Sequence, residues 1–480
     1  MPNAPGAPCR EHFPEALRQR NEPAPTVTSN PKMIDPAKLF AARVPRYTSY
    51  PTAPHFHAGI GEADYRAWLA GLPPGEPISL YVHIPFCDTL CWFCGCNTTV
   101  VNTYSPVSGY FDLLMREMDM VAEALSPGHP VTHLHFGGGS PTLLSPQDFL
   151  HLNRHLRGLF AIAPGAEIAI EIDPRGFTGD MAQALAEAGV TRASIGVQDC
   201  DPAVQKAINR IQPQEVTEDA VRLLRDAGIH ALNIDLIYGL PHQTVAGLER
   251  TIGTVLELGP DRLAIFGYAH VPHFKKHMAL IPESTLPVTA ERMDQAQAAE
   301  AMLIASGYVP IGIDHFAKPG DSLAIARRLG RLSRNFQGYT TDSAPALIGL
   351  GASSIGALPQ GYVQNFADVP SWRSTILRGA LPVAKGIALS GQDRARRAVI
   401  ERLMCDREVD VDAVAKNYGL EPGTFDAALK NLEEFRRDGL VSICEGKITI
   451  PPHWKAATRL VCAMFDTYLD PRIHKHAVAA

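Results

Sequence analysis

From about residue 79 the chain alternates short apolar stretches with amphipathic segments. Segments such as 180–189 and 218–228 have helical periodicity, begin near an acidic residue and end at glycine. This alternation is typical of parallel α/β folds, and we predict a partial (β/α)6 barrel of the TIM-like type. The apolar runs of strand length lie at 79–84, 132–136, 167–172, 192–197, 231–237 and 263–268.

Residues suited to catalysis or ligand binding follow the ends of these predicted strands. Parallel strands bring their carboxyl ends to one face of a barrel, and barrel enzymes place their active sites there. We therefore expect a set of residues that are distant in the sequence to converge. The set comprises His83, Gly137, Gly138, Gly139, Glu171, Asp173, Gln198, Asp235, Tyr268 and His270.

The pattern changes near both ends of the chain, which suggests four parts. Residues 1–40 are rich in proline and alanine without hydrophobic periodicity, so we predict a disordered tail. Residues 41–75 form a substrate or lid segment, 76–380 the catalytic domain, and 381–480 a small C-terminal domain. In that last part, helical patterns precede two short apolar runs at 441–444 and 447–450, which predicts a mostly helical, winged-helix-like fold with a lid or packing role.

The overall charge excludes some classes of function. The net charge is −6 and the pI is about 6.3, so neither nucleic acid nor an anionic membrane is attracted to the average surface. No apolar run is long enough to cross a membrane, and five of the nine cysteines are scattered, as expected in a reducing compartment. We therefore expect a cytoplasmic protein, and a polyanionic substrate would need a local pocket of arginine or lysine.

The other four cysteines lie within residues 87–96. Cys87, Cys91 and Cys94 have the spacing C-x3-C-x2-C, in which each thiolate of a short loop can reach a different iron of a cubane. Iron–sulfur clusters normally have four cysteine ligands, so three would leave one iron open to a substrate or cofactor. A structural zinc site is the alternative, although zinc sites usually combine two separated pairs. Cys96 is badly placed to bind the same cubane, and we interpret it as either a functional thiol or a packing residue.

Several other positions could bind a ligand. The run of glycines at 137–139 allows close approach of the backbone, and Glu171 offers a carboxylate to an ammonium group. Arg210 suits a carboxylate, although it could equally be a surface residue. Asp235 lies in an otherwise apolar strand and needs hydrogen-bond donors, which a ribose diol would supply. Tyr81 and His83 share one face of their strand, and His83 could donate a proton or simply pack in the core.

The cysteine spacing matches the signature of radical S-adenosylmethionine (SAM) enzymes. Within that superfamily the chain closely resembles the oxygen-independent coproporphyrinogen III oxidases, from residue 45 almost to the C-terminus. The matching strings are PRYTSYPTAPHF (45–56), YVHIPFCDTLCWFCGCN (81–97), HFGGGSPT (135–142), EIDPR (171–175), IGVQD (195–199), INRIQ (208–212), NIDLIYGLP (233–241), YAHVP (268–272), DHFAKP (314–319), RNFQGYTT (334–341) and FDTYL (465–469).

The resemblance implies a [4Fe–4S] cluster on Cys87, Cys91 and Cys94 and two SAM molecules. Tyr81, His83 and Cys96 become candidates for catalysis. Ser140 stands where the family commonly has threonine, and its hydroxyl is retained. One SAM molecule would contact Tyr81, Gly138, Glu171 and Ile355, and the other Phe93, Gly139, Ser140, Gln198, Arg210, Asp235 and Ala269.

The implied reaction converts two propionates of coproporphyrinogen III to vinyl groups, giving protoporphyrinogen IX and carbon dioxide. A 5′-deoxyadenosyl radical would remove a hydrogen atom from each propionate β-carbon. Arg46, Lys318 and Arg334 are our candidates for binding the propionates. The expected partners are coproporphyrinogen III and a low-potential electron donor such as flavodoxin or ferredoxin, with no nucleic acid, and the expected state is a monomer.

A haem chaperone of the same superfamily is the main alternative. Such chaperones share the barrel and the three cluster cysteines, and the resemblance implies that they lack the fourth cysteine and the YTSYPT segment. Both features are present here, as Cys96 and residues 47–52, which favours the enzyme. Radical modification of RNA is disfavoured by the acidic balance and the absence of a basic stripe.

Overall fold

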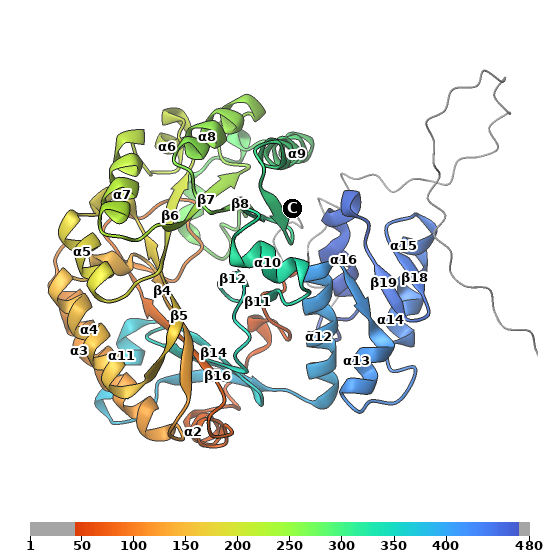
Figure 1. The fold of residues 1–480 in the computed structure, drawn as a ribbon, viewed down its shortest axis with the longest axis horizontal. Coiled ribbons are helices and arrows are strands. Elements are labelled where there is room, and N and C mark those ends of the chain that lie inside the picture. Colours follow the sequence, from red (N-terminus) through yellow and green to blue (C-terminus); the bar gives the residue numbers. More distant parts are fainter. Residues whose placement is uncertain (1–43, 470–480) are drawn as a thin grey trace, which may run out of the picture.

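The computed structural model describes residues 44–469, so the predicted tail at 1–40 and the end of the predicted C-terminal domain lie outside it. A sheet of 12 strands dominates the molecule and curves into a partial barrel with helices on its outer face (Figure 1). Six consecutive parallel strands form its centre, as the alternating pattern predicts. They are β1 (Ile78–Ile84), β4 (Pro130–Gly138), β5 (Ala161–Ile172), β6 (Arg192–Gln198), β7 (Ala231–Tyr238) and β8 (Arg262–Gly267).

A helical segment follows each of these strands and covers the sheet. The predicted helices at 180–189 and 218–228 are present as α5 (Gly179–Glu187) and α7 (Gln214–Asp226). The Thr178 side chain caps α5 by accepting from the Met181 amide. The others are α3 (Ser105–Ala124), α4 (Pro146–Leu159), α6 (Pro202–Ala207), α8 (Val245–Glu257) and α9 (Thr289–Ala305).

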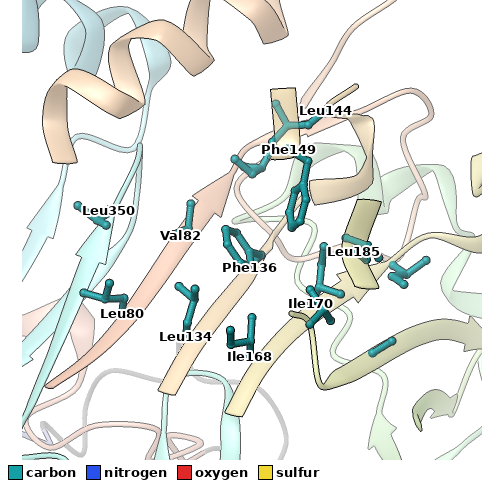
Figure 2. Close-up of a cluster of buried hydrophobic side chains, with 14 of the residues drawn as sticks. Leu80, Val82, Leu134, Phe136, Leu144, Phe149, Ile168, Ile170, Leu185 and Leu350 are labelled. Carbon is teal, nitrogen blue, oxygen red and sulfur yellow. The ribbon is translucent and has the colours of Figure 1, made fainter. Parts of the chain in front are cut away.

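The main core fills the space between the sheet and these helices. Alternate side chains of a strand point to opposite faces, so one row from each central strand is apolar and faces outward to the helices. Phe149 of α4 is fully buried and its ring lies 5.1 Å from that of Phe136. Figure 2 shows the rows Leu80 and Val82, Leu134 and Phe136, and Ile168 and Ile170.

The sheet continues beyond the six predicted strands on both sides. On the β1 side, β13 pairs in parallel with β1, and three antiparallel strands follow it. Beyond β8, β10 and β9 add an antiparallel edge. These strands are β13 (Ala346–Leu350), β14 (Ile355–Leu358), β15 (Gly361–Asn365), β16 (Val383–Ala388), β10 (His315–Ala317) and β9 (Val309–Ile311).

Shorter elements complete this part of the chain. A hairpin of β11 (Ser333–Asn335) and β12 (Gly338–Thr340) stands apart from the large sheet. The remaining helices are α2 (Glu62–Ala70), α10 (Ser322–Arg328) and α11 (Val369–Leu377). None of the helices within residues 44–469 has the length and apolarity needed to cross a membrane.

The C-terminal unit lies beside the barrel and begins with α12 (Gly391–Asp406), drawn in blue in Figure 1. Strand β16 still belongs to the large sheet, so this unit starts after residue 388 rather than at the predicted residue 381. The predicted helices and the two predicted strands are present, but a third strand, β17, joins the small sheet and one further helix, α16, follows it. Its other elements are β17 (Glu408–Asp410), α13 (Val411–Asn417), α14 (Asp426–Asn431), α15 (Glu433–Arg437), β18 (Ser442–Cys444), β19 (Lys447–Thr449) and α16 (Thr458–Ala463).

The N-terminal segment joins the core of this C-terminal unit. Val44, Tyr47 and Tyr50 are buried in the same apolar cluster as Leu403 and Phe465. The Tyr47 hydroxyl donates to the Asp466 carboxylate at 3.1 Å. Residues that are more than 400 positions apart in the sequence therefore stabilise one another beside the barrel.

Candidate active site

The cysteine loop leaves the carboxyl end of β1 and is closed at its base by a short parallel pair, β2 (Phe86–Cys87) and β3 (Thr99–Val100). Cys87, Cys91 and Cys94 have free thiols. The Thr98 hydroxyl donates to Cys87 Sγ at 3.0 Å. The loop is thus fixed at both ends, with one thiol already hydrogen-bonded.

Segment 208–212 holds the middle of the loop. The Ile208 carbonyl accepts from the Trp92 amide at 2.9 Å, and Asn209 Nδ2 donates to the Leu90 carbonyl at 2.9 Å. Asn209 has a φ of 53°, a left-handed conformation that asparagine tolerates better than most residues. The sequence analysis singled out only Arg210 in this segment. The structure shows that the backbone of Ile208 and the side chain of Asn209 also position the cysteine loop.

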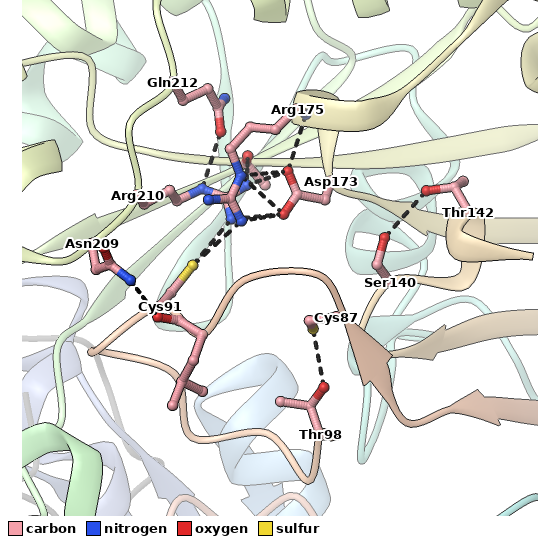
Figure 3. A network of polar contacts seen from close by, with 12 residues as sticks. Cys87, Cys91, Thr98, Ser140, Thr142, Asp173, Arg175, Asn209, Arg210 and Gln212 are labelled. Carbon is pink, nitrogen blue, oxygen red and sulfur yellow. Dashed lines mark hydrogen bonds and ion pairs between the residues drawn. The ribbon is translucent and has the colours of Figure 1, made fainter. Parts of the chain in front are cut away.

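Two arginines lie beside Cys91 (Figure 3). Arg210 Nη1 is 3.6 Å and Arg175 Nη2 is 3.5 Å from Cys91 Sγ. Both arginines pair with Asp173, Arg175 at 2.6 Å and Arg210 at 3.1 Å. Arg210 also donates to the Gly196 carbonyl and to Gln212 Oε1, so its donors are engaged within the protein. The sequence analysis named Arg210 and Asp173 but not their ion pair, and it did not single out Arg175 or Gln212.

The donor set fits an iron–sulfur cluster better than a zinc ion. A tetrahedral zinc site places thiolates about 4 Å apart, because each Zn–S bond is about 2.3 Å. Among residues 44–469, no group of three histidine, cysteine or carboxylate side chains is close enough to hold one metal ion. Three thiolates that bind different irons of a cubane stand further apart. The hydrogen bonds that Cys87 and Cys91 accept from neighbouring side chains also suit the negative charge of a cluster.

The glycine run packs tightly between the barrel and the loop. A Cβ atom at Gly139 would lie 2.4 Å from the carbonyl oxygen of Phe86. Gly138 has a φ of 116°, and a Cβ there would be 2.6 Å from the His83 ring. The amides of Gly139 and Ser140 donate to the carbonyls of Ile84 and Phe86. Glycine is required here because the backbones approach closely, and this run supports the loop directly.

Tyr81 and His83 share one face of β1, as predicted. The Tyr81 hydroxyl lies 2.9 Å from His83 Nδ1, while His83 Nε2 is 3.1 Å from the Asn97 carbonyl and 3.2 Å from Ser353 Oγ. Burial lowers the pKa of His83, because charging an imidazole away from water is costly. A neutral ring is therefore favoured, and it connects the barrel to the end of the cysteine loop.

Glu171 lies at the wall of a cavity of about 270 Å³ next to the loop. Its Oε1 is 3.1 Å from His135 Nε2, and its Oε2 accepts from the Gly138 amide at 3.0 Å. Burial acts to raise the pKa of Glu171, but the hydrogen bonds from His135 and Gly138 lower it below its ordinary value. The side chain is 39% exposed, so a charged carboxylate faces the cavity. Six predicted residues line this cavity: Tyr81, His83, Cys96, Gly138, Glu171 and Ile355.

Asp235 lies inside the barrel, where it lines a second cavity of about 250 Å³ together with Glu171. It accepts hydrogen bonds from Ser194 Oγ at 3.0 Å and Asn233 Nδ2 at 2.8 Å. Burial raises the pKa of Asp235 despite these donors. Ser194 of the neighbouring strand β6 and Asn233 of β7 itself thus supply the donors that the sequence analysis required, and the contribution of Ser194 could not be read from the pattern of β7 alone.

The other predicted ligand residues occupy separate positions. Phe93 packs in an apolar cluster with Ile208 and Tyr268. Ser140 is buried, and its hydroxyl lies 3.3 Å from that of Thr142. Gln198 ends β6 with a φ of 71°, and Ala269 follows β8. These residues do not line any one of the cavities described here as a group. Their role in binding the second SAM molecule stays a prediction.

Two further residues contact the loop without any signal in the sequence. Lys275 Nζ donates to the Cys96 carbonyl at 2.9 Å, and His277 Nε2 is 2.8 Å from the Cys94 carbonyl. Lys318, by contrast, does not reach the candidate site. Its Nζ contacts Gly259 and Asp261 at the amino end of β8, opposite the cysteine loop. Our prediction that Lys318 binds a propionate was therefore wrong, because the residue follows an antiparallel strand.

The chain matches two family models. Residues 81–255 match the radical SAM superfamily, and residues 389–453 match the HemN C-terminal domain. The first match covers the cysteine loop and Glu171, and the second covers most of the C-terminal unit. Both parts of the fold are therefore shared with known proteins.

Curated relatives and a solved structure agree with these matches. An oxygen-independent coproporphyrinogen III oxidase of Bradyrhizobium diazoefficiens is 47% identical, covering 91% of this chain and 97% of the relative. The oxygen-independent coproporphyrinogen III oxidase of Paracoccus denitrificans is 45% identical, and the match covers 92% of this chain and 97% of the relative. The structure of the Escherichia coli coproporphyrinogen III oxidase HemN, a radical SAM enzyme, has a TM-score of 0.85 and 40% identity and covers 88% of this chain and 98% of that one. The chain therefore belongs to the oxygen-independent coproporphyrinogen III oxidases of the radical SAM superfamily.

Proposed function

We propose that the protein converts two propionates of coproporphyrinogen III to vinyl groups, giving protoporphyrinogen IX in haem biosynthesis without oxygen. The observation that carries this proposal is the convergence of the cysteine loop with Tyr81, His83 and Glu171 on one cavity. Cys87, Cys91 and Cys94 would hold a [4Fe–4S] cluster. When bound, the reduced cluster supplies the electron that cleaves SAM to methionine and a 5′-deoxyadenosyl radical.

The residues of the cavity can bind and orient SAM. The Glu171 carboxylate would accept the ammonium group of the amino acid moiety, since its pKa is lowered and the group stays charged near neutral pH. Tyr81 and Ile355 line the same cavity. Arg175 and Arg210 place positive charge beside Cys91, which offsets the negative charge of a thiolate-bound cluster.

We assign the second SAM molecule to the residues that the family resemblance implies: Phe93, Gly139, Ser140, Gln198, Arg210, Asp235 and Ala269. His83 and Cys96 are proposed catalytic groups, because both line the cavity and Cys96 is exposed there. A neutral His83 linked to Tyr81 can hold or pass a proton at Nδ1. We also propose a low-potential electron donor such as flavodoxin or ferredoxin, a monomeric state and a location in the cytoplasm.

An anaerobic assay tests the function. Reconstituted protein is supplied with SAM, a strong reductant and coproporphyrinogen III, and chromatography follows porphyrins and 5′-deoxyadenosine. Protoporphyrin after oxidation of the products is expected. Single Cys87→Ala, Cys91→Ala and Cys94→Ala variants should form neither product. Cys200→Ala, a change at a free cysteine outside the loop, serves as the control and should keep the activity. Formation of deoxyadenosine without decarboxylation would contradict the proposal.

Haem binding decides between this proposal and the chaperone alternative. Tight, stoichiometric binding during haem titration, combined with an inactive assay, would favour the chaperone. The Glu171 cavity and the residues Cys96 and 47–52 favour the enzyme, so we expect no stoichiometric haem complex.

A further inference from the structure

A cavity of about 420 Å³ lies where the barrel, the N-terminal segment and the C-terminal unit meet. Phe266 of β8 and the β11–β12 hairpin form its barrel side, while residues of the C-terminal unit close the opposite side. It lies outside the set of predicted SAM residues. We ask which ligand its side chains would accept.

The lining of this cavity is strongly cationic. Arg46, Arg334, Lys455 and Arg459 face a single lining acid, Asp314. Lys455 pairs with Glu300 at 2.5 Å, and Asp314 lies 2.8 Å from His315 Nδ1. With Lys455 paired and Asp314 offsetting one arginine, two positive charges remain in excess, in a protein whose net charge is −6.

Arg459 of α16 is buried, and no direct polar contact to its guanidinium is present among the described residues. It is only 8% exposed. Burial, together with the nearby Arg46, lowers the pKa of Arg459 to about 10. Leaving a buried charge unpaired is costly, so this position favours an anion.

Arg334 of β11 also has buried guanidinium nitrogens that make no hydrogen bond to the described residues. These are its Nε and Nη1 atoms. The guanidinium carbon lies 4.4 Å from the centre of the Tyr339 ring, which fixes its plane. Arginine presents paired donors that suit a carboxylate, so both arginines are prepared for carboxylate ligands.

The cationic cavity adjoins the Glu171 cavity. Cys96, Phe336 and Gln337 line both. Arg46 stands at the same edge, and its Nη2 donates to the Gly267 carbonyl at the end of β8. A ligand that carries several carboxylates on one large ring could therefore reach the cysteine loop with one side chain and the arginines with others.

We propose that Arg46, Arg334 and Arg459 bind the propionate carboxylates of coproporphyrinogen III that are not at the reacting position. The reacting propionate would then extend toward the Glu171 cavity, where the SAM molecule is proposed to bind. This inference rests on the proposed function and adds a role for the C-terminal unit, which supplies Arg459 to the substrate site.

Binding of coproporphyrin III, the stable oxidised form of the substrate, tests the proposal by fluorescence titration of the reconstituted full-length protein. The Arg459→Gln variant is expected to bind it at least tenfold more weakly, and Arg46→Gln several-fold more weakly. The uncharged tetramethyl ester of coproporphyrin III should bind all variants equally, because it lacks the carboxylates. Arg436→Gln, on exposed helix α15, is the control with the same change of charge.

The outcomes separate failure of this inference from failure of the proposed function. If Arg459→Gln and Arg46→Gln are folded and bind coproporphyrin III within twofold of the unchanged protein, the proposal is overturned. If Arg459→Gln does not fold, the exposed Arg46 decides in the same way. If the unchanged protein binds coproporphyrin III through these arginines but does not decarboxylate its substrate, the proposed function fails and the binding site stands.

Discussion

The carboxylate of Glu171 and the imidazole of His135 face each other across neighbouring strands β5 and β4, with Oε1 and Nε2 3.1 Å apart. The Gly138 amide donates to the other oxygen of Glu171 at 3.0 Å. The carboxylate is thus fixed from two directions before any ligand arrives. Preorganised charge of this kind loses little entropy when an ammonium group binds.

Replacing Glu171 by glutamine should weaken SAM binding without loss of the cluster. A hydrogen bond to a charged group contributes about 1.5–3 kcal/mol, so the Kd for SAM should rise about 10- to 100-fold. Equilibrium dialysis measures the Kd, while iron content and visible absorbance report the cluster. Glu123→Gln, an exposed change on α3, should leave both unchanged. An unaltered Kd in Glu171→Gln would remove Glu171 from the proposed site.

Replacing Thr98 by valine should make the cluster harder to reduce. The Thr98 hydroxyl donates to Cys87 Sγ, and hydrogen bonds to the sulfurs of a cluster stabilise the more negative, reduced state. We expect the reduction potential to move to a more negative value, measured by electron paramagnetic resonance during a redox titration. Thr142→Val is the control, because its hydroxyl contacts Ser140 and no sulfur. A potential equal to that of the unchanged protein would argue against Cys87 as a cluster ligand.

Gly139→Ala should displace the cysteine loop. The added methyl would lie 2.4 Å from the Phe86 carbonyl oxygen, a backbone atom that cannot rotate away. Overpacking typically costs about 1–3 kcal/mol, and we expect a lower melting temperature together with poor retention of iron. The matched control is Gly158→Ala in α4, where nothing lies within 4 Å of the new methyl. That change should be neutral or slightly stabilising, since alanine favours a helix.

Much of the barrel could be predicted because short sequence patterns specify its individual strands and helices. Apolar runs identify β1 and β4 to β8, and the spacing of Cys87, Cys91 and Cys94 indicates a candidate cluster site within one loop. Strand β13 is different. It pairs with β1 although more than 250 residues separate them, and nothing in the apolar pattern of residues 346–350 specifies that partner.

The roles of side chains whose partners are distant in the sequence could not be predicted from the sequence either. Arg210 suggested a carboxylate ligand, but whether Asp173 and Gly196 already use its donors depends on how the loop after α6 lies against β5 and β6. Arg459 gave no signal at all, because a single arginine in a helix is usually exposed. Its burial results from packing of the C-terminal unit against the barrel, which no local pattern encodes.

The stability of the barrel should fall as the pH rises from about 4.5 to 7, because of Glu117. This carboxyl group of α3 is fully buried, and burial raises its pKa from 4.5 to about 7, although it accepts from Gly351, Asn365 and Trp372. The folded state therefore binds a proton that the unfolded state has released over this range, and each pH unit costs about 1.4 kcal/mol. The total loss is about 3 kcal/mol by pH 7.

Urea titrations followed by tryptophan fluorescence at pH 5, 6, 7 and 8 test this prediction. Glu117→Gln cannot ionise, so its free energy of unfolding should depend less on pH than that of the unchanged protein. The difference between the two curves should change from pH 5 to 7 and stay constant above pH 7. Glu123→Gln, at an exposed position of the same helix, should follow the unchanged protein at every pH. Parallel curves for Glu117→Gln and the unchanged protein would mean that the hydrogen bonds from Trp372, Asn365 and Gly351 outweigh burial and keep Glu117 ionised in the fold.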